Sequence, residues 1–449
     1  MAKMSANDYV VDGDNQFRVS PRVYTDGRIF VDEMRDIFER TWVFIAHESE
    51  VPKRGDFKST FIGQRPIVVV RDKTENINAF FNICPHRGAA LCREQYGNYP
   101  VIVCPYHAWS FKTSGECLKI PDEGRYPAGF REGMHLIPVP RVENYGGLIF
   151  GCLNAEVEAL ESFLGDARYY IDAWNARAAG GKFKLGYPNK YSYAGNWKLQ
   201  SENVVDGYHP QVVHSAAFNA MAGAIMAKEK SEAGQAEGGS VEARPGAHYA
   251  AWAKKDVGSL GLTRAFRNGH STLESGIMFE SARVSAEVSQ VWIDRIREIN
   301  GEDMAPDVIL NRHLFIFPNL ALMDFVLRAW YPVAVDRTET YSYALRNEAI
   351  DEALDVGRHL EAQTQYSASG AVAPDDADIF NSVQSAAMTD IPQGLDFSRG
   401  LGTESAGRFG ELVGAISDEV PQRAFWREWA TKMAYKADRT HSSSDGETR

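Results

Sequence analysis

The sequence predicts an α+β protein with two domains: a small all-β domain, and a larger α+β domain in which helices cover a central antiparallel sheet. The chain has 449 residues, which exceeds the usual size of a single domain. Short strand-like runs separated by turn residues occupy residues 46–155, and helical patterns with longer strand-like stretches follow them. We therefore expect the small domain at residues 46–155 and assign residues 1–45 and 156–449 to the larger one.

The individual elements follow from hydrophobic periodicity and turn residues. Residues 17–45 are expected to be mostly helical, because apolar residues such as Ile29, Phe30 and Ile37 recur at helical spacing. Strands of the small domain are expected at Phe57–Ile62, Pro66–Arg71, Ile77–Ile83, Val101–Cys104, Trp109–Phe111 and Gly147–Phe150. A helix should then run from Val157 to Asn175. Strands of the larger domain are expected at Lys184–Tyr193, Leu314–Phe317, Leu320–Val333 and Thr338–Arg346.

Composition restricts the function classes. The net charge of −12 argues against nucleic acid or an anionic membrane surface as the main partner, because both require a basic face. No run approaches the ~18 apolar residues that a spanning helix needs. The first residues lack the apolar core of a signal peptide, so we expect a cytoplasmic protein. The cysteine count of 5 is odd, which disfavours a disulfide framework.

Two cysteine–histidine pairs give the first indication of chemistry. Cys84-Pro85-His86 is followed, after seventeen residues, by Cys104-Pro105-Tyr106-His107. Two thiolates and two imidazoles suit a Rieske [2Fe–2S] centre, in which two His replace two Cys on one iron. Zinc is the alternative for such a donor set. The spacing favours the cluster, because each loop offers one Cys and one His, and each iron can take a like pair across the loops. The other three cysteines are expected to be buried apolar residues.

These segments resemble the cluster motif of Rieske non-haem iron oxygenases. The resemblance rests on Cys-Pro-His-Arg-Gly at 84–88 and Cys-Pro-Tyr-His-Ala-Trp at 104–109. It implies that Cys84, His86, Cys104 and His107 hold the cluster. The family's usual residue after the last His is Gly, whereas this chain has Ala108. We expect Ala108 to be tolerated if the backbone there does not adopt a positive φ.

A second group of candidate ligands lies at His209 and His214. Their i,i+5 spacing would separate them by about 140° on an ideal helix, so one regular helix carrying both is not expected. Pro210 suits the first position of a helix, which would place His209 at the helix entrance and His214 on its second turn. Two His and one carboxylate with open positions form the facial site of non-haem Fe(II) oxygenases. If the cysteine–histidine pairs of the first group were absent, the alternative would be that His209 and His214 are ordinary histidines without a metal.

The segment from Asp206 to His214 resembles the mononuclear-iron motif of the same oxygenases, Asp-x-x-His-x-x-x-x-His. The resemblance implies that His209 and His214 ligate iron. It also implies that Asp206 acts in catalysis, as the carboxylate that joins an iron-ligating His to the cluster histidine His107 of a neighbouring subunit. The third ligand is expected in the stretch Ser369–Asp376, which resembles the family's Asp-Asp pair. We assign the third ligand to Asp376, with Asp375 as the alternative. The non-functional interpretation of either residue is a carboxylate that caps the N-terminus of a helix.

Substrate contacts are expected around this iron. By position, the lining residues would be Asn203, Gly207, His313, Phe317 and Tyr366, although each is equally compatible with ordinary core packing. Arg312 or Arg328 is a candidate to meet a substrate carboxylate through a bidentate pair, and a structural ion pair is the alternative for each. No Gly-x-Gly-x-x-Gly motif follows a strand, so no nicotinamide or flavin module is expected, and electrons must come from another protein.

The resemblance covers residues 20–435 and is strongest to the large α subunit of ring-hydroxylating dioxygenases of the benzoate, anthranilate and cumate kind. It implies cis-dihydroxylation of an aromatic ring by O₂, with an aromatic carboxylate as substrate. The implied cofactors are a Rieske [2Fe–2S] cluster and mononuclear Fe(II). The implied partners are a ferredoxin, an NADH-dependent reductase or both, and a small β subunit. The implied assembly is a homotrimer of α or α3β3, with no nucleic acid and no membrane. A Rieske monooxygenase and a Rieske electron carrier are the alternatives.

Overall fold

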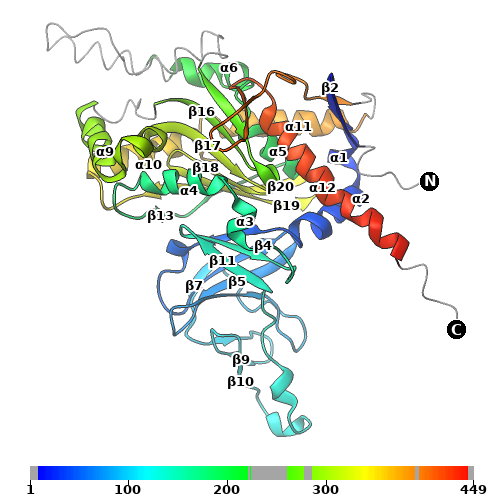
Figure 1. The fold of residues 1–449 in the computed structure, drawn as a ribbon. Helices are drawn as coiled ribbons and strands as arrows, with labels where there is room; N and C mark the ends of the chain where they lie inside the picture. The colour runs from blue at the N-terminus through cyan, green and yellow to red at the C-terminus, as the bar shows by residue number, and fades with distance from the viewer. Residues whose placement is uncertain (1–8, 221–222, 224–259, 278–285, 390–393, 443–449) are drawn as a thin grey trace. The chain divides into compact units, whose positions relative to one another are not determined.

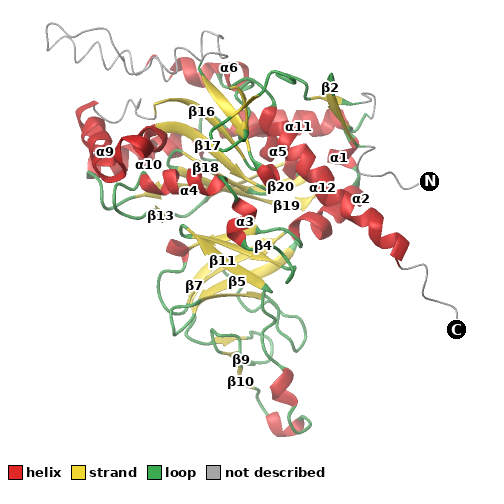
Figure 2. Cartoon of the chain, in the orientation of Figure 1, coloured by secondary structure: helices red, strands yellow, loops and turns green. Residues whose placement is uncertain are grey.

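The computed structural model describes residues 9–220, 223, 260–277, 286–389 and 394–442 (Figure 1). The chain forms two compact units. The smaller comprises Glu33–Phe163, and the larger joins Met1–Asp32 to Leu164–Arg449. The narrower domain range of 46–155 stays a prediction. Figure 2 shows that the smaller unit is built mainly from strands, whereas the larger combines a sheet with helices, as the predicted α+β class requires.

The smaller unit contains three antiparallel sheets. The largest has the order β6-β5-β4-β7. Its strands are β4 (Asp56–Ile62), β5 (Arg65–Arg71), β6 (Ile77–Phe81) and β7 (Tyr96–Asn98). The second sheet, β11-β12-β3, contains Arg141–Tyr145, Leu148–Cys152 and Val43–His47; the third, β10-β9-β8, contains Cys117–Lys119, Ser110–Phe111 and Ile102–Val103. β5 is rich in β-branched residues, and Ile67 to Val70 are fully buried, which anchors the main sheet in the core.

The expected helix over residues 17–45 is only partly present. The chain begins with a hairpin of β1 (Val10–Gly13) and β2 (Gln16–Val19). Helical turns follow at α1 (Arg22–Thr25), α2 (Gly27–Glu33) and a π-helical segment that ends at residue 38. The segment after them forms β3 instead, because it pairs with the distant β12 and every one of its residues is buried. A fully buried apolar run has no periodicity that separates strand from helix.

The larger unit is organised by one long antiparallel sheet. Its order is β13-β20-β19-β18-β17-β16-β15-β23-β22, and β14 pairs with β20. The strands are β13 (Lys184–Leu185), β14 (Asn189–Tyr193), β15 (Gly261–Ala265), β16 (Ser271–Ile277), β17 (Leu310–Ile316), β18 (Leu320–Met323), β19 (Val326–Ala334), β20 (Arg337–Arg346), β22 (Ser405–Ala406) and β23 (Leu412–Ala415). A short strand β21 (Leu395–Asp396) pairs with β2.

The helices are α3 (Leu160–Leu164), α4 (Ala167–Ala176), α5 (Trp197–Asn203), α6 (Pro210–Val213), α9 (Ala286–Ile309), α10 (Glu352–Tyr366), α11 (Ala373–Ala387) and α12 (Val420–Ser442). The expected helix at 157–175 thus occurs as the pair α3 and α4. In the described part of the chain, no helix combines the length and the hydropathy that crossing a membrane demands.

Neighbouring residues of β17 show how the two sheet faces differ. Side chains alternate along a strand, so Arg312 and His313 point to opposite faces. The Arg312 guanidinium lies 4.7 Å from the ring centre of Tyr170 on α4. His313 Nδ1 instead donates to the carbonyl of Val204, directly after α5, at 2.9 Å. The face that carries His313 is therefore the one on which α5 ends and the second histidine motif begins.

Candidate metal centres

Two loops with the same hydrogen-bonding pattern hold the first group of candidate ligands. In the first loop, the N–H of Gly88 donates to the carbonyl of Cys84 at 3.0 Å. In the second, the N–H of Ala108 donates to the carbonyl of Cys104, also at 3.0 Å. The N–H of Cys84 donates to the carbonyl of Ala89, and the N–H of Cys104 donates to the carbonyl of Trp109, both at 2.8 Å. The two loops are therefore closed turns of matching geometry, and each presents one Cys and one His.

Ala108 occupies a backbone conformation that favours glycine. Its φ is +58°, and Gly88 at the equivalent place in the first loop has φ +74°. The condition under which Ala108 was expected to be tolerated, a backbone without a positive φ, is therefore not met. The turn needs a left-handed residue to close the hydrogen bond back to the cysteine, and a Cβ there costs roughly 1–2 kcal/mol.

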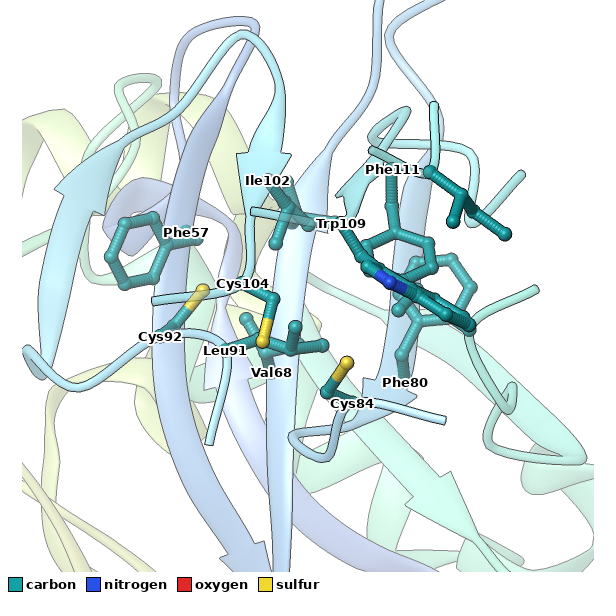
Figure 3. Packing of buried hydrophobic residues seen from close by; sticks show 13 residues of the cluster. Phe57, Val68, Phe80, Cys84, Leu91, Cys92, Ile102, Cys104, Trp109 and Phe111 are labelled. Atoms are coloured by element: carbon teal, nitrogen blue, oxygen red, sulfur yellow. The ribbon is translucent and has the colours of Figure 1, made fainter. Parts of the chain in front are cut away.

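The four side chains of these loops fit a cluster with one sulfur pair and one nitrogen pair. Figure 3 shows the sulfur atoms of Cys84 and Cys104 directed into the same space, and burial together with Cys104 raises the pKa of the Cys84 thiol to about 11. The ring centres of His86 and His107 lie 4.6 Å apart. The Nδ1 atoms of both histidines are buried and have no hydrogen-bond partner among the described residues. Two buried sulfurs beside two unsatisfied ring nitrogens match the Rieske donor set.

The second group of candidate ligands is built by the turn that follows α5. Asn196 caps the helix, because its side chain accepts from Lys198 N–H at 3.2 Å. After the helix, Asp206 Oδ1 accepts from the N–H groups of Tyr208 and His209 at 2.6 and 3.2 Å and fixes the turn into α6. Pro210 is the first residue of α6, as expected. The helix ends at Val213, however, so His214 follows α6 rather than lying on a second turn.

Asp376 completes this group from a distant segment of the sequence. His209 Nε2 lies 3.4 Å from Asp376 Oδ1, and His214 Nε2 lies 3.1 Å from the same oxygen. One ligand atom from each of the three residues falls within 4.8 Å of the others. The side chain of Asp376 is only 6% exposed and that of His214 only 3%. Two imidazoles and one carboxylate on one side of a metal form the facial arrangement typical of non-haem Fe(II).

Two further carboxylates face the other nitrogens of the same histidines. Asp206 Oδ2 lies 3.6 Å from His209 Nδ1, and Asp375 Oδ2 lies 3.5 Å from His214 Nδ1. Carboxylates in this position fix the tautomer and the ring orientation of metal-ligating histidines. Asp375 is 46% exposed, in contrast to the buried Asp376. The geometry therefore favours Asp376 as the ligand and Asp375 as the residue that orients His214.

The electrostatics of this group also suit a cation. Burial disfavours a charged imidazole at His209, but Asp206 and Asp376 outweigh burial and raise its pKa to about 10. Burial likewise opposes ionisation of Asp376, but His209 and His214 lower its pKa well below the ordinary value. Three carboxylates surround two imidazoles, so the group as a whole attracts positive charge.

The five residues expected to line a substrate pocket have different surroundings. Asn203 donates to Asp376 Oδ1 at 3.1 Å and so lies at the metal-ligand group. Tyr366 lies beside Arg328, whose guanidinium is 5.3 Å from its ring centre. His313 is held by the Val204 carbonyl, and burial lowers its pKa. Gly207 and Phe317 are packed tightly. A Cβ at Gly207 would collide with the Ile416 carbonyl, and Phe317 lies 5.7 Å from the ring of Phe425.

Sequence reasoning did not identify the role of Asp375 or distinguish Arg328 from Arg312. The adjacent pair Asp375-Asp376 lies in the first turn of α11, where consecutive side chains point about 100° apart. One carboxylate can therefore be buried while the next is exposed. Arg312 is engaged by Glu274 and Asp307, at 2.8 and 3.2 Å, on the face away from the metal-ligand group. Side chains alternate between the two faces along β17 and β19. This alternation is the sequence signal that could have shown that Arg312 and Arg328 lie on opposite faces.

Comparison with known families accounts for most of the chain. The family described as Rieske [2Fe-2S] domain matches residues 41–142. The family described as ring hydroxylating alpha subunit (catalytic domain) matches residues 181–435. Both groups of candidate ligands fall inside these matches.

Curated relatives match along nearly the full length. The chain is 34% identical to the 2-halobenzoate 1,2-dioxygenase large subunit of Burkholderia cepacia over 92% of this chain and 89% of that protein. It is 35% identical to the toluate 1,2-dioxygenase subunit alpha of Pseudomonas putida, over 95% and 94%. Among solved structures, naphthalene 1,2-dioxygenase with indole bound in the active site has a TM-score of 0.83 at 24% identity and 98% coverage of both chains, which supports the fold.

Proposed function

Because the chain belongs to the Rieske non-haem iron oxygenases, as an aromatic ring-hydroxylating dioxygenase α subunit, we propose that its substrate is an aromatic carboxylate and its reaction is cis-dihydroxylation. The observation that carries the proposal is the convergence of His209, His214 and Asp376 in a chain that also contains the two cluster loops. An electron carrier has no need of this second group. The relatives named for halobenzoate, toluate and anthranilate support a carboxylated ring.

We assign the metal ligands as follows. Cys84 and Cys104 would hold one iron of the cluster, and His86 and His107 the other through their buried Nδ1 atoms. His209, His214 and Asp376 would hold the mononuclear iron. When bound, the cluster supplies single electrons and the mononuclear iron supplies O₂ activation.

The surrounding residues position these ligands. Asp206 and Asp375 face the Nδ1 atoms of His209 and His214, so the Nε2 atoms of both rings point to Asp376. Asn203 donates to Asp376 Oδ1 and holds that carboxylate in its rotamer. The backbone N–H bonds to Asp206 keep its Oδ1 occupied and leave Oδ2 for His209. The protein thus fixes the ring orientations before a metal binds.

Asp206 is also the proposed contact to a neighbouring copy of the chain. Its side chain is 30% exposed, so it can meet His107 of another subunit while it faces His209. This arrangement favours a head-to-tail trimer, since rotation by a fixed step closes a ring. The relatives are named large or alpha subunits, which supports a small β subunit as partner. We further propose a ferredoxin or an NADH-dependent reductase as donor, and a cytoplasmic location.

Product analysis with labelled oxygen tests the proposed function. The purified chain, loaded with both metals and supplied with NADH and a reductase, is incubated with ¹⁸O₂ and benzoate. A cis-diol with two labelled oxygen atoms is expected. A product with one labelled atom would identify a monooxygenase instead. An iron content of about two rather than about three per chain, without any oxidised product, would identify an electron carrier.

A further inference from the structure

We propose that Arg328 binds the carboxylate of the aromatic substrate, an inference that rests on the proposed function. Arg328 lies on β19 and is only 2% exposed. Its Nε and Nη2 atoms are buried and have no hydrogen-bond partner among the described residues. An unpaired buried charge is costly, and a guanidinium is best satisfied by a carboxylate that accepts two parallel hydrogen bonds.

Three other buried arginines of the larger unit already have acceptors. Arg312 donates to Glu274 Oε1 at 2.8 Å, and Arg423 donates to Glu404 Oε1 at 2.6 Å. Arg177 donates to the carbonyl of Leu310 at 2.6 Å. These three have the partners expected of structural arginines, whereas the fork of Arg328 is open along the edge formed by Nε and Nη2.

The register of the sheet places Arg328 on the face that carries His313. His313 pairs with Met323, and Met323 pairs with Val326, so these side chains share a face. Arg328 is two residues from Val326 on β19 and therefore points to the same side. Arg312 is one residue from His313 and points to the opposite face, toward α4. Of the two arginines, only Arg328 lies on the face toward the metal-ligand group.

The neighbours of Arg328 connect it to the proposed iron ligand. Its guanidinium lies 5.3 Å from the ring centre of Tyr366. Burial raises the pKa of both Tyr191 and Tyr366, and the charges of Arg328 and Asp376 act on both hydroxyls. Both hydroxyls therefore lie within electrostatic range of Arg328 and of Asp376, which places Arg328 in the same region of the larger unit as the metal-ligand group. The charge of Arg328 matches the carboxylate of an aromatic acid, and the neighbouring ring of Tyr366 matches its apolar part.

Binding of two ring compounds of the same shape tests the assignment. Benzoate carries the charge, and benzamide is its neutral counterpart. Equilibrium dialysis measures the Kd of each for the metal-loaded protein under anaerobic conditions. In Arg328→Met, the Kd of benzoate should rise by at least about tenfold, because charge-assisted hydrogen bonds are lost. The Kd of benzamide should change by less than about threefold, since it makes no ion pair. Arg328→Lys should retain part of the preference for benzoate, because it keeps the charge without the planar fork.

Two controls separate an anchor from a structural residue. Arg312→Met removes a buried arginine from the opposite face, and the ratio of the two Kd values should stay that of the natural protein. Without benzoate, Arg328→Met should not lower the free energy of unfolding, because no buried partner is left unpaired. A structural ion pair would produce a loss of stability instead.

The outcomes also distinguish this inference from the proposed function. Equal losses for benzoate and benzamide, or an unchanged Kd for benzoate, would overturn the role of Arg328. If the natural protein oxidised neutral rings but did not bind benzoate, the role of Arg328 would also be refuted. The assignment as an oxygenase would still hold. Benzoate binding that depends on Arg328, without any dihydroxylated product from the fully loaded enzyme, would support the anchor and refute the proposed reaction.

Discussion

Substitution of the adjacent carboxylates Asp375 and Asp376 tests the division of roles in the mononuclear site. Asp376→Asn removes the negative charge of the carboxylate whose Oδ1 lies 3.4 and 3.1 Å from the two Nε2 atoms, so iron should be lost while the cluster is retained. Asp375→Asn neutralises only a carboxylate that lies 3.5 Å from His214 Nδ1 and does not reach the Nε2 side of the site. The second variant should therefore bind iron, but more weakly.

The expected size of the Asp375 effect follows from its exposure. Substitution of a carboxylate that orients a metal-ligating His typically lowers metal affinity by about 10- to 100-fold. The Asp375 side chain is 46% exposed, and solvent screens such a contact. We therefore expect the lower end of the range, a Kd for Fe(II) about tenfold above that of the natural protein.

Anaerobic titration of Fe(II) into protein that keeps its cluster but lacks mononuclear iron measures these affinities. Asp378→Asn is the matched control, because Asp378 lies on the same helix, is exposed, and undergoes the same charge change. The reasoning fails if Asp375→Asn binds Fe(II) as tightly as the Asp378 control. It fails equally if Asp376→Asn retains the iron and Asp375→Asn loses it.

The remaining predictions concern the cluster loops, the bridging carboxylate and the partly buried Glu202. A Cβ at Gly88 would have ordinary contacts, so only φ opposes it; Gly88→Ala should lower and Ala108→Gly raise the free energy of unfolding, each by about 0.5–1 kcal/mol in denaturant titrations. His86→Ala should abolish the Rieske EPR signal, and survival of that signal would remove this ligand. With iron saturating, Asp206→Ala should keep both metal centres but lose nearly all turnover; normal turnover would contradict its bridging role. Burial raises the pKa of Glu202 to about 8. Its contribution to stability is therefore complete below the ordinary pKa of 4.5 and is lost as pH rises through about 8. In Glu202→Gln, unfolding measured from pH 5 to 9 should lack this decline.

Local motifs were predictable because they depend on short stretches of chain. The two cluster loops need a cysteine, a proline and a histidine at fixed spacing, and the structure closes both in the same way. The entrance to α6 was predictable from Pro210 for the same reason. The φ of Ala108 was not predictable, because the residue type does not reveal the left-handed conformation that the turn imposes.

Features that depend on distant contacts were not predictable. β3 becomes a strand because it pairs with β12, about a hundred residues later in the sequence. The pocket assignment of Gly207 and Phe317 rests on sequence position and stays a prediction, whereas their packing against Ile416 and Phe425 depends on distant segments. Similarly, the sequence does not show which of Arg312 and Arg328 faces the metal-ligand group. Only the register of the sheet assigns them to opposite faces.

Exposure explains why three carboxylates around the two histidines can have different roles. Asp376 is 6% exposed, and its Oδ1 lies close to both Nε2 atoms. Its buried negative charge is therefore best compensated by a buried cation. Asp206, at 30%, can orient His209 and still present an edge to a neighbouring subunit. Asp375, at 46%, can orient His214 but is screened by solvent. A sequence identifies all three as acidic residues near histidines, but their order of burial arises only when α11 packs against the turn after α5. The functional ranking of the acids is therefore a property of the tertiary fold.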